Sequence, residues 1–269
     1  MDDAAAGAGE RGYLRVALSY LLIAAAAFLA GVINSLAGGG TLISFPTMVW
    51  LGRPPIMANA TNAVALWPGS LSAMFGYRED MARVRRWLFL LMIPSVAGGA
   101  LGAVLLLHTS EKTFARLVPF LILGATLLLA AQELISRKLN LIAKAHENPT
   151  VGWVVFVFTF QLLVGVYGGY FGAGMGILML AALGLIGLTD LHEMNGLKNL
   201  LAVGINGVAA IYFAISGAVI WSDAILMAVA AILGGLAGAK IAHRLGRRFV
   251  RVAVVAIGLG MTIALLLKR

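Results

Sequence analysis

Lys198 is the residue in this chain best placed to act on a charged molecule within an apolar environment. It lies in the run from Glu193 to Asn199, where a long apolar segment begins. An ionisable side chain at membrane depth indicates a functional site, and an ammonium group there favours an anion as its partner. A lysine one turn inside the membrane surface can instead extend towards lipid headgroups, and the sequence leaves this alternative open.

Amide side chains accompany this lysine and recur in the first half of the chain. Asn195, Asn199 and Asn206 share its segment, and the first two are four residues apart, on one face of a helix. In the first half, Asn62 and Trp67 occupy the matching segment. Amides in an apolar helix need hydrogen-bond partners, which are either a substrate or a neighbouring helix. We treat these five residues as candidate substrate-binding residues and keep helix-to-helix bonding as the alternative.

Two glycine-rich breaks supply a second element of the predicted site. Gly38-Gly39-Gly40-Thr41 closes an apolar run in the first half, and Gly172-Ala173-Gly174-Met175 closes one in the second. Glycine-interrupted apolar segments at matching positions of two halves point to the substrate site of a secondary transporter. A short helix after each break would direct its positive dipole end and unpaired N–H groups at an anion. The candidates here are Asn34, Gly39, Gly40, Thr41, Gly174 and Met175, with close helix packing by glycine as the alternative.

Two titratable residues lie at the entry of the Lys198 segment. His192 and Glu193 could exchange protons beside a membrane lysine and so couple proton movement to transport. Ordinary residues of the membrane interface are the alternative.

The elements that carry these residues follow from the spacing of charge. No charged residue lies between Arg15 and Arg53, or between Glu147 and Asp190. Each run is too long for one span of about 20 residues and too short for two full ones. We therefore predict a helix, a glycine turn and a short helix in each run, over 16–36 and 41–51, and over 153–171 and 175–188. Three further segments follow in each half: 55–77, 87–107 and 113–135, then 193–216, 224–239 and 252–267.

Composition assigns the whole chain to the membrane. Hydrophobic residues make up 61% and charged residues 12% of the 269 residues, and the mean hydropathy is +0.96. Soluble proteins carry about 25% charged residues. The net charge of +9 resides in basic clusters between apolar runs, which are typical of membrane orientation signals and require no nucleic acid partner. The chain has no cysteine, so disulfide and thiol chemistry are excluded.

Basic residues also predict how the two halves lie in the membrane. The loop after the third segment carries Arg78, Arg83, Arg85 and Arg86 in the first half, whereas residues 217–223 in the second carry none. The next loop has the opposite bias, since 240–251 is the basic one. With five segments in each half, the halves are inverted, and both termini are predicted outside the cytoplasmic membrane. The expected fold is an all-α polytopic membrane protein of two inverted repeats, 1–145 and 146–269, forming a single transport domain.

At this level of detail the chain resembles a known family. The stretch from Gly31 to Pro46, followed by Ala58-Asn59-Ala60-Thr61-Asn62, resembles the first-repeat signature of the sulfite exporter TauE/SafE family, also called toluene sulfonate uptake permeases. The stretch from Gly168 to Gly174, then Lys198-Asn199 and 217–221, resembles its second repeat. The similarity covers nearly the whole chain. It implies an inverted-repeat secondary transporter for sulfur-containing anions such as sulfite, sulfoacetate or other organosulfonates.

Several functions remain to be compared with this expectation. A metalloenzyme would need a pair of histidines around a glutamate, but His192-Glu193 has no second histidine after it, so we expect no enzyme and no cofactor. A passive anion channel would use the same helix dipoles and buried cation, and stays the main alternative. The expected partners are a small anionic substrate and the lipid bilayer, without nucleic acid. The oligomeric state is open, with a homodimer among the alternatives.

Overall fold

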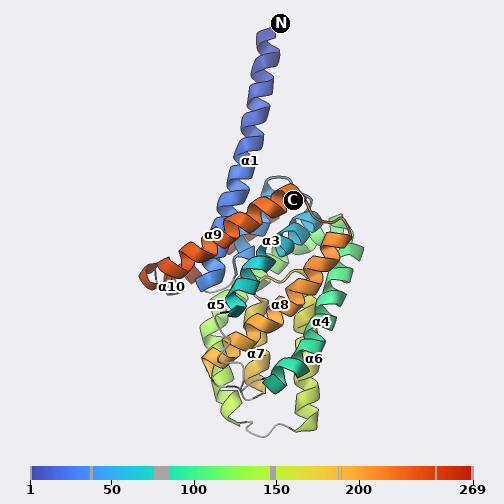
Figure 1. Ribbon diagram of the computed structural model, residues 1–269, viewed down its shortest axis with the longest axis vertical. Helices are drawn as coiled ribbons and strands as arrows, with labels where there is room; N and C mark the ends of the chain where they lie inside the picture. The colour runs from blue at the N-terminus through green and yellow to red at the C-terminus, as the bar shows by residue number, and fades with distance from the viewer. Residues whose placement is uncertain are drawn as a thin grey trace.

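The computed structural model describes residues 2–36, 39–75, 85–145, 150–186, 188, 190–245 and 247–267 (Figure 1). Within these ranges the chain is all helical and has no strand, as the sequence predicts. The helices are α1 (Asp2–Leu36), α2 (Thr41–Trp50), α3 (Pro55–Phe75), α4 (Arg85–His108), α5 (Glu111–Ala145), α6 (Val151–Tyr170), α7 (Met175–Leu185), α8 (Leu191–Ile215), α9 (Trp221–Leu245) and α10 (Arg247–Leu267).

Six of the described helices contain a segment long and apolar enough to cross a membrane. These segments are Tyr13–Asn34, Trp87–His108, Glu111–Ile135, Val151–Tyr170, Gly196–Ile215 and Trp221–Gly238. The apolar helices Thr41–Trp50 and Met175–Leu185 and the segment Val252–Leu267 are shorter. The chain is therefore a multi-pass membrane protein that contains shorter apolar helices besides its candidate spans.

Several helices continue beyond the apolar segments expected from the sequence. α5 extends to Ala145 rather than 135, α9 ends at Leu245, and α10 begins at Arg247 rather than 252. Lys, Arg, Glu and Ala are good helix formers, so a helix does not end where its apolar run ends. α1 likewise begins at Asp2, and its N-terminal part extends past the other helices (Figure 1).

Both predicted breaks separate a long helix from a short one. Gly39 has a φ of +96°, and Gly172 and Gly174 have φ values of +78° and +75°, a region that glycine adopts without steric cost. Ala37 and Gly38 lie outside the described residues. A Cβ atom added to Gly40 would lie 2.3 Å from the carbonyl oxygen of Ala30, so the chain after the first break returns against α1.

Glycines also allow two pairs of helices to approach at backbone distance. A Cβ atom at Gly31 or Gly234 would meet the carbonyl oxygen of the partner helix at 2.1 or 2.0 Å, across the α1–α9 contact. A Cβ at Gly98 or Gly169 would do so at 2.4 or 2.1 Å, across the α4–α6 contact. Gly98 and Gly234 therefore serve close helix packing.

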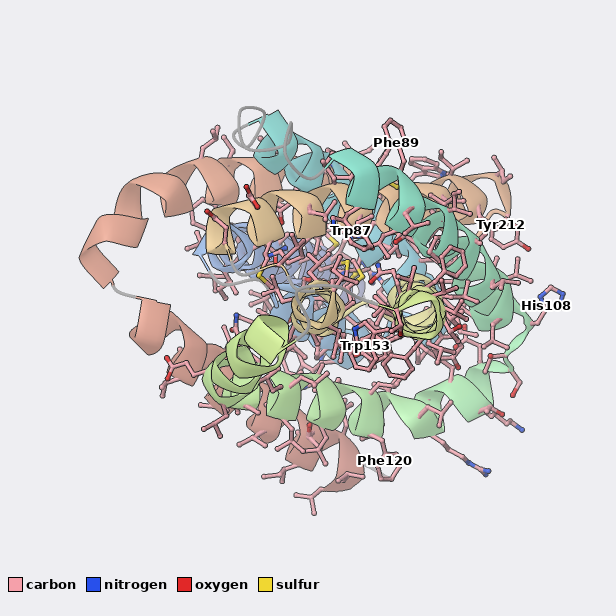
Figure 2. The ribbon with its side chains drawn as sticks, turned by 90° about the horizontal axis from the view of Figure 1, so that it is seen from below. Trp87, Phe89, His108, Phe120, Trp153 and Tyr212 are labelled. Atoms are coloured by element: carbon pink, nitrogen blue, oxygen red, sulfur yellow. The ribbon has the colours of Figure 1, made fainter. Side chains whose placement is uncertain are left out.

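Large apolar side chains cover the outside of the bundle. Phe89 is 62% exposed and Phe120 is 58% exposed, and Figure 2 shows them projecting from opposite sides of the molecule. Trp153 lies among the helices in the same view and donates from Nε1 to the Leu185 carbonyl oxygen at 2.6 Å. An apolar exterior of this kind fits a lipid environment.

Candidate substrate-binding site

α3 is the most polar helix in the interior, and it packs against α2, α5, α8 and α9. Its first turns bury Asn59, Thr61 and Asn62, none more than 3% exposed. Asn59 donates from Nδ2 to the Tyr170 carbonyl oxygen at 3.0 Å. Thr61 accepts from the N–H of Ile220 at 2.9 Å. These bonds join the first half of the chain to the second.

Asn62 is held differently, because it contacts the short helix α2. Its Oδ1 accepts a hydrogen bond from the hydroxyl of Ser44. The Ser44 hydroxyl also lies 3.3 Å from the Gly40 carbonyl oxygen. Since Oδ1 takes part in this contact, the amide N–H groups of Asn62 are the donors that can serve a ligand.

A small polar cavity of about 60 Å³ lies where these elements meet. It is lined by residues of α2, α3, the end of α6, the second break and α8: Thr41, Asn59, Asn62, Ala63, Leu66, Trp67, Gly168, Gly169, Phe171, Gly172, Asn206 and Phe213. A cavity needs a volume of about 10–15 Å³ to hold one water molecule. The cavity therefore has room for a compact anion in place of a few water molecules.

Four of the predicted site residues thus come together at this cavity, namely Thr41, Asn62, Trp67 and Asn206. Trp67 donates from Nε1 to the Val203 carbonyl oxygen at 3.2 Å. Its ring atoms would lie 3.1 Å from a Cβ at Gly207, so the absence of a side chain there lets the indole seat between α3 and α8. Trp67 therefore both lines the cavity and joins α3 to α8.

The backbone at the first break is arranged differently from the prediction of unpaired N–H groups. Asn34 Oδ1 accepts from the Gly40 N–H at 2.8 Å. The N–H groups of Leu42 and Ile43 bond to the carbonyl oxygens of Gly39 and Gly40, each at 2.9 Å. These N–H groups therefore already have acceptors within the turn, and the bond from Asn34 stabilises the turn. For an anion, the N-terminus of α2 therefore offers the positive end of its helix dipole and the Thr41 side chain.

The second break has a similar arrangement. The Met175 N–H bonds to the Gly172 carbonyl oxygen at 3.2 Å, and the Ile177 N–H to that of Gly174 at 3.0 Å. Tyr167 donates its hydroxyl to the Ala173 carbonyl oxygen at 2.5 Å. The expectation of an unpaired donor is wrong for Met175, because the turn itself supplies its acceptor.

The remaining glycine and methionine candidates have packing contacts. A Cβ at Gly39 would lie 3.5 Å from Leu129, and one at Gly174 would lie 3.5 Å from Ala125, both on α5. The sulfur of Met175 would lie 2.6 Å from a Cβ at Gly168, a residue that lines the cavity. These three candidates surround the breaks and do not line the cavity.

Lys198 lies on α8, where it is half-buried and close to the start of α7. It does not line the cavity. Its Cδ would lie 3.5 Å from a Cβ at Gly176. Eight residues of α8 separate Lys198 from Asn206, which corresponds to about 12 Å along the helix. In this conformation Lys198 lies two turns of helix away from the cavity, with its apolar stem against α7.

The other candidates on α8 lie near its beginning. Asn199 is half-buried outside the cavity, and the side chains of His192 and Asn195 lie outside the described part of the structure. The Asp190 carboxylate accepts from the Glu193 N–H at 3.2 Å, an arrangement that caps the start of the helix. The proton-coupling role of His192 and Glu193 stays a prediction.

Some residues at the cavity were not among the predicted site residues. Asn59 lies in the same polar run as Asn62, and its place one turn before Asn62 on one helix face would have identified it. Ser44 does not line the cavity but bonds to Asn62, and it lies one turn after Thr41 on the short helix. Phe171 and Phe213 have no sequence signal, because an aromatic residue in an apolar helix is usually a packing residue.

The fold and the cavity together define a multi-pass helical membrane protein with a polar site built from both halves of the chain. Comparison with known proteins identifies its family. The profile described as "Sulfite exporter TauE/SafE" matches residues 23–265. The chain belongs to this family, as its resemblance implied.

Relatives with curated names cover nearly the same length. The chain is 30% identical over 236 residues to a "Probable membrane transporter protein" of Haemophilus influenzae, covering 87% of this chain and 89% of the relative. It is 32% identical over 251 residues to "Probable membrane transporter protein ORF9" of Sinorhizobium sp, covering 93% and 92%. No solved structure gives a significant match. The relatives are named as transporters, in line with the expectation that the chain is not an enzyme.

Proposed function

We propose that this protein is a secondary transporter that moves sulfur-containing anions, such as sulfite, sulfoacetate or other organosulfonates, across the cytoplasmic membrane. The observation that carries the proposal is the polar cavity, which lies inside an apolar bundle and is lined by residues of α2, α3, α6 and α8. Buried amides without a substrate role would be saturated by neighbouring helices. Asn62 instead lines a cavity that can hold a compact anion, and its amide N–H groups are proposed to bind that anion.

The proposed substrate binds through hydrogen-bond donors, with positive charge supplied from a distance. Asn62, Asn206 and Thr41 provide donors to the anion's oxygen atoms, and Trp67 covers it. The positive end of α2 points to the same region. Lys198 contributes electrostatic attraction from α8, and Asn195 and Asn199 serve as further hydrogen-bonding residues for the substrate.

We further propose that the halves 1–145 and 146–269 are inverted repeats of a single transport domain. The contacts between helices support this, since they occur in matched pairs. α1 packs on α9 as α6 packs on α4, and α2 contacts α10 as α7 contacts α5. α3 and α8, which hold the polar residues, contact each other at the centre.

Transport in the proposed mechanism occurs by alternating access. One repeat rocks against the other around the cavity, so that the anion faces each side in turn. His192 and Glu193 exchange the coupling proton.

We propose that both termini lie outside. A cysteine introduced at Ser110 in this cysteine-free chain should then react with an impermeant maleimide on intact cells, and a cysteine introduced at Thr150 should not. The reverse labelling pattern would show the opposite orientation.

Uptake into proteoliposomes tests the substrate class. Sulfite, sulfoacetate, taurine, sulfate and chloride are offered separately, with protein-free vesicles as the control. We expect selective uptake of sulfite or a sulfonate. Equal flux of all five anions would contradict a selective substrate site and favour a passive anion channel.

A further inference from the structure

A second hollow lies on the outside of the bundle, where α2 ends and α3, α5 and α10 meet. This groove of about 460 Å³ is lined by Val49, Pro55, Ala115, Arg116, Val118, Pro119 and Leu265. Its size falls in the range of about 300–1,000 Å³ that is typical of small-molecule sites. It shares no residue with the polar cavity.

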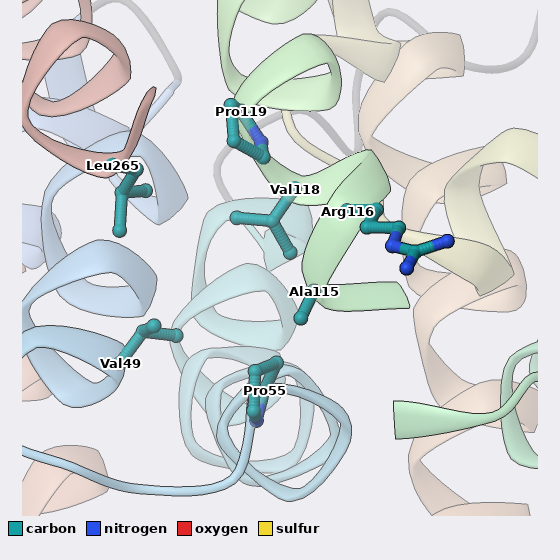
Figure 3. A pocket seen from close by; sticks show the side chains of 7 residues that line it. All are labelled: Val49, Pro55, Ala115, Arg116, Val118, Pro119 and Leu265. Carbon is teal, nitrogen blue, oxygen red and sulfur yellow. The ribbon is translucent and has the colours of Figure 1, made fainter. Parts of the chain in front are cut away.

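The lining of this groove separates apolar from charged groups. Figure 3 shows Val49, Val118 and Leu265 turned towards a common space, whereas the Arg116 guanidinium points away from them. An apolar wall of this kind is unsuited to a small, fully ionised anion, which would lose its hydration there without compensation. The occupant must therefore carry both an apolar chain and an anionic group.

The depth of the groove in the membrane points in the same direction. The α5 span begins at Glu111, so Arg116 lies about 7.5 Å along the helix from that end. This is the depth at which arginine side chains reach lipid headgroups while their stems stay in the acyl region. Lys112 is exposed one turn earlier on the same face of α5.

The backbone of α5 adds an acceptor beside this cation. Pro119 lies inside the helix and has no N–H, so the Ala115 carbonyl oxygen lacks its usual helical donor. Arg116 already interacts within the protein, but a guanidinium carries five N–H donors and can bind a phosphate as well. A donor for phosphate and an acceptor for a hydroxyl group thus lie at adjacent residues.

We propose that this groove binds an anionic glycerophospholipid of the phosphatidylglycerol type. One acyl chain lies against Val49, Val118 and Leu265, the phosphate binds Arg116, and a glycerol hydroxyl donates to the Ala115 carbonyl oxygen. The lipid joins α5 and α10, which come from different halves of the chain. This inference does not depend on what the protein transports.

Lipid retention measured by native mass spectrometry tests the proposal. The full chain is reconstituted in nanodiscs of equal phosphatidylglycerol and phosphatidylcholine, released into mild detergent and analysed for bound lipid. We expect phosphatidylglycerol to be retained in preference. Arg116→Gln should weaken this retention by roughly fivefold, the effect of one cation near an anionic lipid. Arg15→Gln, which removes an exposed cation from α1, should leave it unchanged.

Filling the groove separates a site from general surface charge. Ala115→Trp adds bulk at an exposed, groove-lining position and keeps every charge, so it should also reduce phosphatidylglycerol retention. Leu265→Trp narrows the groove from α10 and serves if the first variant aggregates. Equal retention of the two lipids by the unmodified protein would overturn the proposal. So would wild-type retention in Arg116→Gln or in a correctly folded groove-filling variant.

Discussion

Polar side chains inside the bundle divide into those that join helices and those that can serve a ligand. Asn59 and Trp67 each direct one N–H group to a carbonyl oxygen, of α6 and α8 respectively, so these two N–H groups are already used. Asn62 accepts from Ser44 through its oxygen, which leaves its nitrogen for the cavity. Asn62 is therefore the residue whose replacement tests the cavity most directly.

Asn62→Asp should reduce anion uptake by more than tenfold, while the protein stays folded. The carboxylate can still accept from Ser44, but it cannot donate as the amide does, and hydrogen bonds to charged groups contribute about 1.5–3 kcal/mol. The measurement is initial uptake of the substrate into proteoliposomes. Ser222→Asp is the matched control, because it adds the same charge at an exposed position in the first turn of α9. Equal uptake by the two variants would remove Asn62 from the site.

Lys198 tests whether charge at a distance contributes. Its stem packs near Gly176, so Lys198→Met keeps an apolar chain there and removes only the ammonium group. We expect weaker substrate affinity in this variant and in Lys198→Ala, measured as a raised substrate concentration for half-maximal uptake. Wild-type affinity in both variants would show that the Lys198 charge makes no contribution to substrate binding.

The sequence predicted the residues of the cavity better than their roles. Thr41, Asn62, Trp67 and Asn206 could be predicted because a polar or amphipathic side chain in an apolar helix needs a partner. Asn34 was expected to bind an anion, but it caps the turn at Gly40. A backbone donor in a break can bond to the turn or to a ligand, and only the three-dimensional path of the chain decides between them.

Among the helix ends too, some follow from the sequence and others do not. The starts of α2 and α7 at Thr41 and Met175 follow from the glycine breaks, because positive φ values favour glycine. The ends of α5 and α9 did not follow, because apolar periodicity marks membrane depth whereas helical structure continues through charged residues. The starts of these two short helices are thus better predicted than helix lengths.

The contact between α4 and α6 depends on glycine, and an alanine scan should show it. Gly102→Ala would place a Cβ 2.1 Å from the Val166 carbonyl oxygen, so we expect a loss of about 1–3 kcal/mol of stability, as for other overpacked sites. Gly124→Ala on α5 has no atom within 4 Å and should be neutral or stabilising. Thermal unfolding in detergent compares the two. Equal melting temperatures would contradict the close approach of α4 and α6.

The connection between α2 and α3 is tied to α9 by an ion pair. Arg53 Nε lies 2.7 Å from Asp223 Oδ2, and the Asp223 side chain is 0% exposed. The hydrogen bond to Asp223 raises the pKa of Arg53, so the guanidinium stays charged and its contribution is fully present below the ordinary pKa of arginine. The Arg53 guanidinium also lies 6.0 Å from the Tyr20 ring centroid on α1.

Removing the two partners of this pair should have unequal effects. Arg53→Met leaves a buried carboxylate without its cation and should cost up to about 3–5 kcal/mol. Asp223→Asn removes that charge and should cost less. Chemical unfolding of both variants and of the double variant measures the coupling between the two residues. Additive losses would show that the pair contributes no coupling energy.

At the scale of the whole molecule, the two halves contribute equally to the proposed mechanism. The cavity takes lining residues from α2 and α3 of the first half and from α6 and α8 of the second. Movement of one half against the other would therefore change access to the cavity on both sides of the membrane.

Accumulation against a gradient tests the central claim of coupled transport. Proteoliposomes are equilibrated with the same known concentration of labelled sulfite, or of the sulfonate selected by the uptake panel, on both sides of the membrane. A pH gradient is then imposed across the membrane. We expect the internal concentration to rise above the external one and to fall back when a protonophore collapses the gradient. An internal concentration that never exceeds equilibrium, with or without the gradient, would contradict the account and identify a passive channel.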